Sequence, residues 1–480
     1  MTCHLALDLG AESGRAIVGV LEHGALTLHE VHRFPNIPLR AADGLHWDMP
    51  TLWNEIQASL AAARAFPVVS VGLDTWGVDF ALLDRQGALL SQPYHYRDSR
   101  TDGMMTKALR RVPRGAIFAQ TGIQFMPINT LYQLLALVEQ SSPLLEAAHT
   151  FLTIPDLFNY WLTGAITAEF TNATTTQCFN LLTHNWAFPL LEALNIPTHF
   201  FPPVAEPGTI LGPLTLPQAS PLSVVAPACH DTGSAVVAVP AENKDFVWLS
   251  SGTWSIMGVE AEAPNLGARA LALNFTNEGG VNGTWRLSKN IMGLWLIQGC
   301  QRAWDIAYED IARLAAEARP FLAVIDPDDS RFLHPADMPE AIRAFCGDTH
   351  QPLPHTRGEV ARVALESLAL KYRWVLEQLE ALTGRPLAPL HIVGGGARND
   401  LLNQWTANCL GRVVIAGPFE ATAIGNLLMQ AIALKELTSL AEARAVVRRS
   451  LAVRVFEPQR DERWEAGCEK LTAVMNRESP

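Results

Sequence analysis

Positive charge is scarce in this sequence of 480 residues, which has 36 lysine and arginine residues against 48 aspartate and glutamate residues. The formal net charge of −12 argues against nucleic acid or an anionic membrane as a main partner, because both require a basic binding surface. Hydrophobic residues make up 49% of the chain and charged residues 18%, which is typical of a folded protein. A chain of this length is too long to fold around one hydrophobic core, so we expect two domains.

Cysteine is also sparse, and its pattern excludes two kinds of scaffold. There are seven cysteines, an odd number, and no CxxC pair, so neither a disulfide framework nor a structural zinc site is expected. The N-terminus opens directly into a strand-like pattern without a signal-peptide pattern, and no uncharged apolar run is long enough to span a bilayer. These absences predict a cytoplasmic protein with reduced thiols.

The P-loop pattern G-x-x-x-x-G-K-[ST] does not occur. Each half of the chain nevertheless begins with another pattern that is suited to binding phosphate, and this pattern is the same in both halves. Residues 5–15 and residues 247–255 both read as a strand, a tight turn of glycine and hydroxyl residues, and a second strand. Such turns direct backbone N–H groups and hydroxyls toward one point, where they can hold a phosphate. The pair predicts two similar domains that grip a nucleotide between them, with one aspartate orienting a metal ion.

Alternating strand and helix patterns predict an α/β fold. Residues 104–200 read as mostly helical, and we interpret this block as an insertion that closes over a substrate. The remaining predicted elements are helices at 50–65, 359–382, 399–410 and 420–434, and strands at 68–73, 78–83, 390–393 and 413–416.

The strongest catalytic candidate is Asp231, in the run 229–233 that follows an apolar strand. An aspartate before Thr-Gly is also a common helix cap, so a purely structural role stays open. The position near the junction of the two halves favours a carboxylate that accepts the proton of a substrate hydroxyl during phosphoryl transfer.

Two weaker motifs each have a structural and a functional interpretation, and a third depends on spacing. The glycines at 394–396 form either a plain turn or a surface against which adenosine lies. Trp76, between Asp74 and Asp79, either stacks on a sugar or belongs to the core. Asn290 and Gln298 are eight residues apart, a spacing that would place them near one face of a helix.

In this order the motifs resemble the FGGY family of carbohydrate kinases, and within it the rhamnulokinases, over nearly the whole chain. The stretches that carry the resemblance are 8–15, 74–79, 154–157, 229–233, 251–254, 274–280, 289–295, 394–399 and 420–426.

The resemblance implies two actin-like ATPase domains of the ribonuclease H type with a cleft between them. Residues 1–242 would form the sugar-binding domain and residues 243–480 the nucleotide-binding domain. The implied reaction is the phosphorylation of L-rhamnulose at its 1-hydroxyl by ATP, with Mg²⁺, in L-rhamnose breakdown. The partners would be a ketose and ATP, and the protein a monomer or a dimer.

Site residues follow from the resemblance position by position. Asp231 would be the general base, and Asp8 would orient Mg²⁺. The sugar contacts would be Gly77, His230, Asp231, Thr232 and Asn290. The ATP contacts would be Ala11, Glu12, Ser13, Gly14, Arg15, Thr253, Gln298 and Gly395.

The residues leave other functions open. The chain could be another FGGY kinase that acts on L-fuculose, L-ribulose or D-xylulose. It could also be an actin- or Hsp70-like ATPase without a small-molecule acceptor, or a sugar-binding regulator without catalytic activity.

Overall fold

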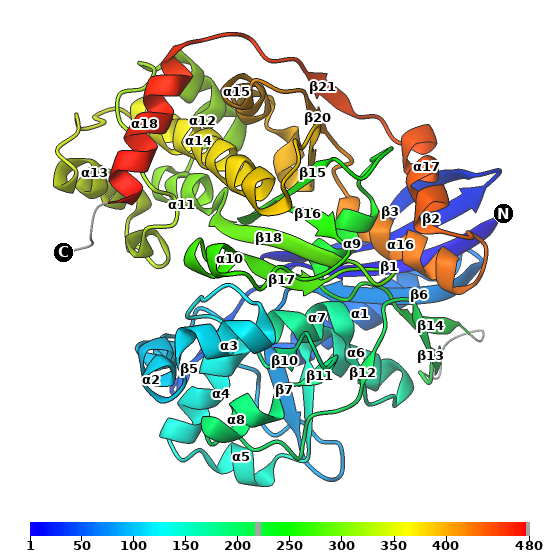
Figure 1. The fold of residues 1–480 in the computed structure, drawn as a ribbon. Coiled ribbons are helices and arrows are strands. Elements are labelled where there is room, and N and C mark those ends of the chain that lie inside the picture. The colour runs from blue at the N-terminus through cyan, green and yellow to red at the C-terminus, as the bar shows by residue number, and fades with distance from the viewer. Residues whose placement is uncertain (217–221, 477–480) are drawn as a thin grey trace. The chain divides into compact units, whose positions relative to one another are not determined.

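The structure is a computed structural model that describes residues 1–216 and 222–476, and it divides into two compact units (Figure 1). The first unit comprises Met1–Glu242, Glu260–Leu287 and Ala421–Leu451. The second comprises Asn243–Val259, Ser288–Glu420 and the described residues from Ala452 onward. Two segments that lie late in the chain therefore pack with the N-terminal half.

The first unit is built on a six-stranded mixed sheet with the order β13-β14-β6-β1-β2-β3. Its strands are β1 (Thr2–Leu9), β2 (Ser13–Glu22), β3 (Ala25–Pro35), β6 (Val68–Thr75), β13 (Thr209–Pro213) and β14 (Ser223–Ala226). The hairpins β1-β2 and β2-β3 are antiparallel, whereas β6 pairs in parallel with β1 and with β14. The predicted strand, turn and strand at residues 5–15 is confirmed.

Helices from distant parts of the sequence cover this sheet. Helix α16 (Ala421–Ala433), orange in Figure 1, packs against β1 and against α9 (Asp231–Val237). The approach of α16 to α9 requires a glycine, because a Cβ at Gly425 would lie 1.8 Å from the Ser234 carbonyl oxygen. Burial of Ile17, Ala423 and Leu427 fixes the contact of α16 with the sheet from both sides. The segment 421–451 thus completes the core of the first unit.

Residues 104–200 are mostly helical, as predicted, and belong to the first unit. The helices are α2 (Met104–Arg111), α3 (Arg114–Thr121), α4 (Thr130–Glu139), α5 (Pro143–Ala147), α6 (Ile154–Thr163), α7 (Phe170–Ala173) and α8 (Phe188–Ala193). The predicted strand at 78–83 is β7 (Phe80–Leu83), which pairs with β8 (Thr150–Thr153) outside the main sheet. Helix α1 (Met49–Ala62) begins at the predicted position, where the Asp48 carboxylate accepts from Thr51 N.

A seven-stranded sheet with the order β17-β18-β16-β15-β19-β20-β21 carries the second unit. Its strands are β15 (Val247–Ser251), β16 (Trp254–Ala261), β17 (Thr276–Gly279), β18 (Trp285–Met292), β19 (Leu390–Val393), β20 (Val414–Ala416) and β21 (Arg454–Phe456). Strand β17 and the first residues of β18 belong to the first unit. Strand β19 is parallel to both β15 and β20, and the hairpin β15-β16 confirms the second predicted strand–turn–strand.

The helices of the second unit include the two predicted at 359–382 and 399–410. The longest, α14 (Arg357–Thr383), begins with a capping box formed by Thr356 and Glu359 and ends at Gly384, whose φ is +71°. The others are α11 (Trp295–Trp304), α12 (Tyr308–Glu317), α13 (Met338–Asp348), α15 (Asp400–Leu410) and α18 (Arg463–Met475). Among the helices that the structure describes, none combines the length and the apolar character needed to cross a bilayer.

Candidate functional site

Two aspartates lie side by side at the carboxyl ends of neighbouring parallel strands in the first unit. Asp8 of β1 and Asp74 of β6 are register partners, and each is at most 1% exposed. The backbone of Thr75 continues this edge, because its N–H donates to Cys229 O at 2.9 Å. Ligands favour the carboxyl ends of parallel strands in open α/β sheets, so this edge is the natural place for a site.

Asp231 joins the same edge from the start of α9. His230 is the N-cap, so Asp231 is the first residue of the helix and not its cap. Its Oδ1 accepts from Thr232 N at 2.5 Å and from Thr232 Oγ1 at 3.1 Å. Burial raises the pKa of Asp231, and the nearby Asp8 carboxylate raises it further. With 31% of its side chain exposed, the carboxylate is accessible to a substrate.

The turn between β1 and β2 presents the predicted phosphate-binding residues. Gly10 N donates to Ser13 O at 3.0 Å and closes the turn, and Glu12 and Ser13 are exposed. Gly14 is required here, because a Cβ would lie 2.2 Å from the Phe34 ring.

Arg15 turns back from this loop onto Asp8. Its Nε and Nη2 atoms lie 2.8 and 2.7 Å from Asp8 Oδ2. The pair neutralises one carboxylate at an edge that also carries Asp74 and Asp231. Glu12 and Ser13, at the tip of the loop, stay exposed, so a phosphate can approach the turn there.

Asp74 is a buried acid whose ionisation the surroundings oppose. Its Oδ2 accepts from Asn426 Nδ2 at 2.6 Å, while within the described chain Oδ1 has no hydrogen-bond partner. Burial, and then the charge of Asp8, raise the pKa of Asp74 well above its ordinary value.

Gly77 lies directly after this edge, and the neighbouring Trp76 has the structural role. A Cβ at Gly77 would lie 3.0 Å from Thr175 Oγ1, so the glycine allows close packing. Trp76 is 5% exposed, packs on Trp47 at 4.0 Å between ring centroids, and donates to Asp79 Oδ2. The structure therefore supports the core interpretation of Trp76, because its ring is almost fully enclosed.

The second unit has its own polar edge, built from backbone and glycine. Ser251 ends β15, and the glycines at 394–396 follow the parallel strand β19, so both segments lie at one edge of the sheet. The contact is tight, since a Cβ at Gly396 would lie 2.0 Å from Ser251 Oγ. At Gly395, by contrast, a Cβ would meet no atom of the described residues within 4 Å.

Thr253 and Gln298 are brought together through the start of α11. The carbonyls of Gly252 and Thr253 accept from Leu294 N and Trp295 N, both at 3.1 Å. Gln298 follows one turn later in α11, whereas Asn290 belongs to β18. The expectation that Asn290 and Gln298 share a helix face is therefore wrong, because the strand ends at Met292 and the chain turns before α11.

Sequence reasoning missed two buried residues that contact His230. Glu278 Oε2 lies 3.4 Å from His230 Nδ1, and Arg286 Nη2 lies 3.0 Å from the same nitrogen. Glu278 stands in a stretch that carries the family resemblance, but its contact with His230 joins residues far apart in the sequence. Arg286 interrupts an otherwise strand-like run, which was the one available signal.

Direct metal coordination by the protein alone finds no support in the described residues. Among them, no group of three His, Cys, Asp or Glu side chains is arranged to hold a metal ion. Mg²⁺ often binds through one or two carboxylates, waters and substrate phosphates, so the carboxylate edge of Asp8 fits that ion in a nucleotide complex.

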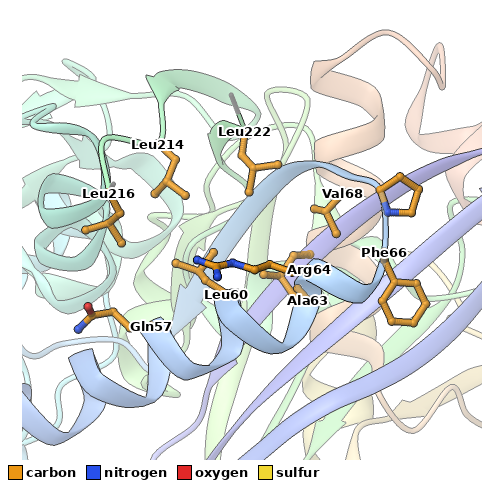
Figure 2. Close-up of a pocket in the computed structure, with 11 residues that line it drawn as sticks. Gln57, Leu60, Ala63, Arg64, Phe66, Val68, Leu214, Leu216 and Leu222 are labelled. Carbon is orange, nitrogen blue, oxygen red and sulfur yellow. The ribbon is translucent and has the colours of Figure 1, made fainter. Parts of the chain in front are cut away.

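A separate pocket lies near the opposite ends of the same strands (Figure 2). It has a volume of about 260 Å³ and is lined mainly by apolar side chains, with Leu5, Leu60 and Val68 among them. Val68 begins β6 and Asp74 lies near its end, and six residues of strand span about 20 Å. The pocket is therefore distinct from the carboxylate edge.

Solved structures show which class of fold contains these two edges. A ligand-bound xylulose kinase from Lactobacillus acidophilus superposes with a TM-score of 0.81 at 16% identity, covering 99% of this chain and 97% of the other. A Plasmodium falciparum glycerol kinase with ADP gives 0.79 at 15% identity, with coverage of 99% and 98%. The protein has the two-domain sugar kinase fold of the actin-like ATPase type, as predicted.

Sequence comparisons then identify the family. The model of the FGGY family of carbohydrate kinases matches residues 3–238 with its N-terminal domain and residues 247–434 with its C-terminal domain. A rhamnulokinase from Bacteroides thetaiotaomicron is 46% identical over 469 residues, covering 96% of this chain and 97% of its own. A rhamnulokinase from Bacillus subtilis is 42% identical over 468 residues, covering 95% of each. The chain belongs to the FGGY family of carbohydrate kinases and is a phosphotransferase with an alcohol group as acceptor.

Proposed function

We propose that the protein transfers the γ-phosphoryl group of ATP to the 1-hydroxyl of L-rhamnulose and so yields L-rhamnulose 1-phosphate. The near full-length similarity to several rhamnulokinases supports this substrate over L-fuculose, L-ribulose and D-xylulose. The observation that carries the chemistry is the state of Asp231, one of whose oxygens is held by Thr232 while the carboxylate stays accessible.

Asp231 acts as the general base in this proposal. Thr232 orients the carboxylate through Oδ1, which leaves Oδ2 to accept the proton of the sugar hydroxyl as that oxygen attacks phosphorus. The raised pKa of Asp231 makes it a stronger proton acceptor than an ordinary aspartate. In a loose transition state the proton leaves late, so positioning contributes as much as basicity.

The remaining residues divide between the two units. In the first unit, Gly77, His230 and Thr232 contact the ketose, and residues 11–15 contact the phosphates. In the second unit, Thr253, Gln298 and Gly395 contact ATP, and Asn290 contacts the sugar. Residues 1–242 thus serve mainly the sugar and residues 243–480 mainly the nucleotide.

Mg²⁺ would be held near Asp8, through water and the ATP phosphates, and would neutralise charge on the phosphates. The cytoplasm is the proposed compartment, because all seven cysteines are free thiols. No membrane or nucleic acid partner is needed for this activity, and a monomer and a dimer are both compatible with it.

The test is a panel of L- and D-ketoses in a coupled assay of ADP release, with the phosphorylated carbon located by NMR. L-Rhamnulose should have the highest kcat/KM and give only the 1-phosphate. Equal or faster turnover of D-xylulose would show that L-rhamnulose is not the preferred substrate. ATP hydrolysis indifferent to sugar would favour an actin- or Hsp70-like ATPase, and sugar binding in calorimetry without phosphate transfer would favour a regulator.

A further inference from the structure

A buried arginine, glutamate and histidine form a continuous polar cluster behind Asp231 in the first unit. Arg286, Glu278 and His230 are 1%, 4% and 6% exposed. Arg286 Nε donates to Gly279 O at 2.8 Å, which anchors the guanidinium to β17. Its Nη2 atom lies 3.2 Å from Glu278 Oε2, so the two buried charges compensate each other.

The atoms that face His230 Nδ1 decide which ring nitrogen carries the proton. Arg286 Nη2 is the nearer group at 3.0 Å, and Glu278 Oε2 follows at 3.4 Å. A guanidinium has donors and no acceptor, so a hydrogen bond between these nitrogens requires Nδ1 to accept. A neutral ring that accepts at Nδ1 carries its proton on Nε2.

The second ring nitrogen gives the same answer independently. His230 Nε2 lies 3.4 Å from Asp231 Oδ1. With the proton on Nε2, the ring directs a donor at the Asp231 carboxylate. With the proton on Nδ1 instead, the lone pair of Nε2 would face a carboxylate lone pair, and the Nδ1–H group would face an N–H group of Arg286. A protonated ring would place a second buried cation directly against the guanidinium. Of the two neutral tautomers, the contacts with Arg286 and Asp231 favour the one with its proton on Nε2, and the Arg286 contact at 3.0 Å is shorter than the opposing approach of Glu278 Oε2 to Nδ1 at 3.4 Å.

We infer that Arg286 is a positioning residue that fixes His230 in the neutral Nε2–H tautomer and so directs a hydrogen-bond donor at Asp231 Oδ1. Together with the two donors of Thr232, this occupies Oδ1 and reserves Oδ2 for the substrate hydroxyl. His230 then orients the base and does not itself take the proton. The catalytic meaning rests on the proposed function of Asp231, but the tautomer is a property of the free protein.

The tautomer can be measured directly, without ATP or sugar, on the full chain labelled with nitrogen-15 histidine. Two-bond nitrogen–proton correlation spectra at neutral pH distinguish the two neutral tautomers and the imidazolium. The His230→Gln variant assigns the signal among the 14 histidines. We expect an unprotonated Nδ1 and a protonated Nε2. A protonated Nδ1 at neutral pH would overturn the inference, whatever the substrate panel shows.

Substitutions then test whether Arg286 sets the tautomer. Arg286→Met/Glu278→Gln removes the donor without leaving a buried charge, and the His230 signal should shift toward tautomer exchange. Arg286→Lys, which keeps a cationic donor, should restore part of the wild-type signal. Glu278→Gln alone should leave Nε2 protonated. If only Glu278→Gln moves the signal, Glu278 and not Arg286 controls the ring.

Enzyme activity gives a second readout. A purely structural role of Arg286 would not change kcat and the KM for ATP in the way expected for a positioning residue. The double variant should lose about 10-fold to 100-fold in kcat, the range known for partners that fix the tautomer of a metal-bound histidine, with little change in the KM for ATP. Arg444→Lys, at a buried pair with Glu260 in the same unit, is the matched control and should keep both parameters. An equal loss in the control, or a loss confined to the KM for ATP, would overturn the role of Arg286.

Discussion

The two polar edges of this protein consist of different chemical groups. The edge of the first unit consists of carboxylates on buried backbone, and its properties depend on protonation, as the raised pKa values of Asp74 and Asp231 indicate. The edge of the second unit consists of backbone and glycine around Ser251, with close contacts between the two turns. The difference suggests that the first edge performs proton chemistry, whereas the second recognises a ligand by shape.

This contrast separates the kinds of damage that substitutions should cause. A change at the carboxylate edge removes a charge and leaves the packing nearly intact, so it should appear in kcat and in pH dependence. A change at the glycine edge adds volume, so it should appear in stability and nucleotide affinity.

The largest effect is expected for Asp231→Asn, which keeps the shape and removes the base. We expect kcat to fall by about 10²-fold to 10⁴-fold, while the Kd for ATP measured by calorimetry stays unchanged. Asp102→Asn, at an exposed position in the same unit, is the control and should behave as wild type. A near-normal kcat in Asp231→Asn would show that Asp231 is not the general base and would contradict the proposed difference between the two edges.

Gly396→Ala should cause a larger loss of stability than any substitution at the carboxylate edge. Its Cβ would lie 2.0 Å from Ser251 Oγ and 3.0 Å from Ser251 O, so the turn after β19 must move. Such overpacking costs about 1–3 kcal/mol, which urea unfolding followed by fluorescence would detect. The double variant with Ser251→Gly should recover part of that loss. An unchanged midpoint in the single variant would mean that the glycine edge is more adaptable than its contacts imply.

Asp74→Asn should change the dependence of stability on pH. The pKa of Asp74 is raised in the folded state, so the folded chain keeps a proton that the unfolded chain releases above its ordinary pKa of about 4. The wild type therefore loses up to about 1.4 kcal/mol per pH unit as the pH rises through this window, and Asn removes that slope. Unfolding midpoints compared at pH 5 and pH 8 should differ less in the variant. Equal slopes in both proteins would show that Asp74 is ionised in the fold.

The sequence was a good guide to elements that local patterns define. The hairpins at both edges follow from apolar runs interrupted by glycine and hydroxyl residues, and α14 follows from its apolar stripe and the stop at Gly384. The placement of the acid Asp231 after an apolar strand also held in the structure, although its structural interpretation as a helix cap did not.

What the sequence did not reveal depends on contacts between distant residues. Nothing local signals that residues 421–451 pack with the first unit, because α16 meets β1 only in the folded chain. The spacing of Asn290 and Gln298 predicts one helix face, because spacing alone does not distinguish a continuous helix from a strand followed by a turn. Arg286 was missed because a buried charge is explained only by its partners, and Glu278 and His230 come from other segments.

The smallest structural effect, and the sharpest test of the glycine edge, is expected for Gly395→Ala. Its Cβ would meet no atom within 4 Å in the part of the chain that the structure describes, so the unfolding free energy should change by less than about 0.5 kcal/mol. If ATP lies against this backbone, the new methyl group displaces it, and the Kd for ATP should rise about tenfold, equivalent to about 1.4 kcal/mol. Gly115→Ala, whose Cβ would lie 3.9 Å from the Leu271 side chain, is the control for a glycine far along the chain from this edge. Because the described residues leave this space open, a loss of affinity would report contact with the ligand, and an unchanged Kd would place the nucleotide elsewhere.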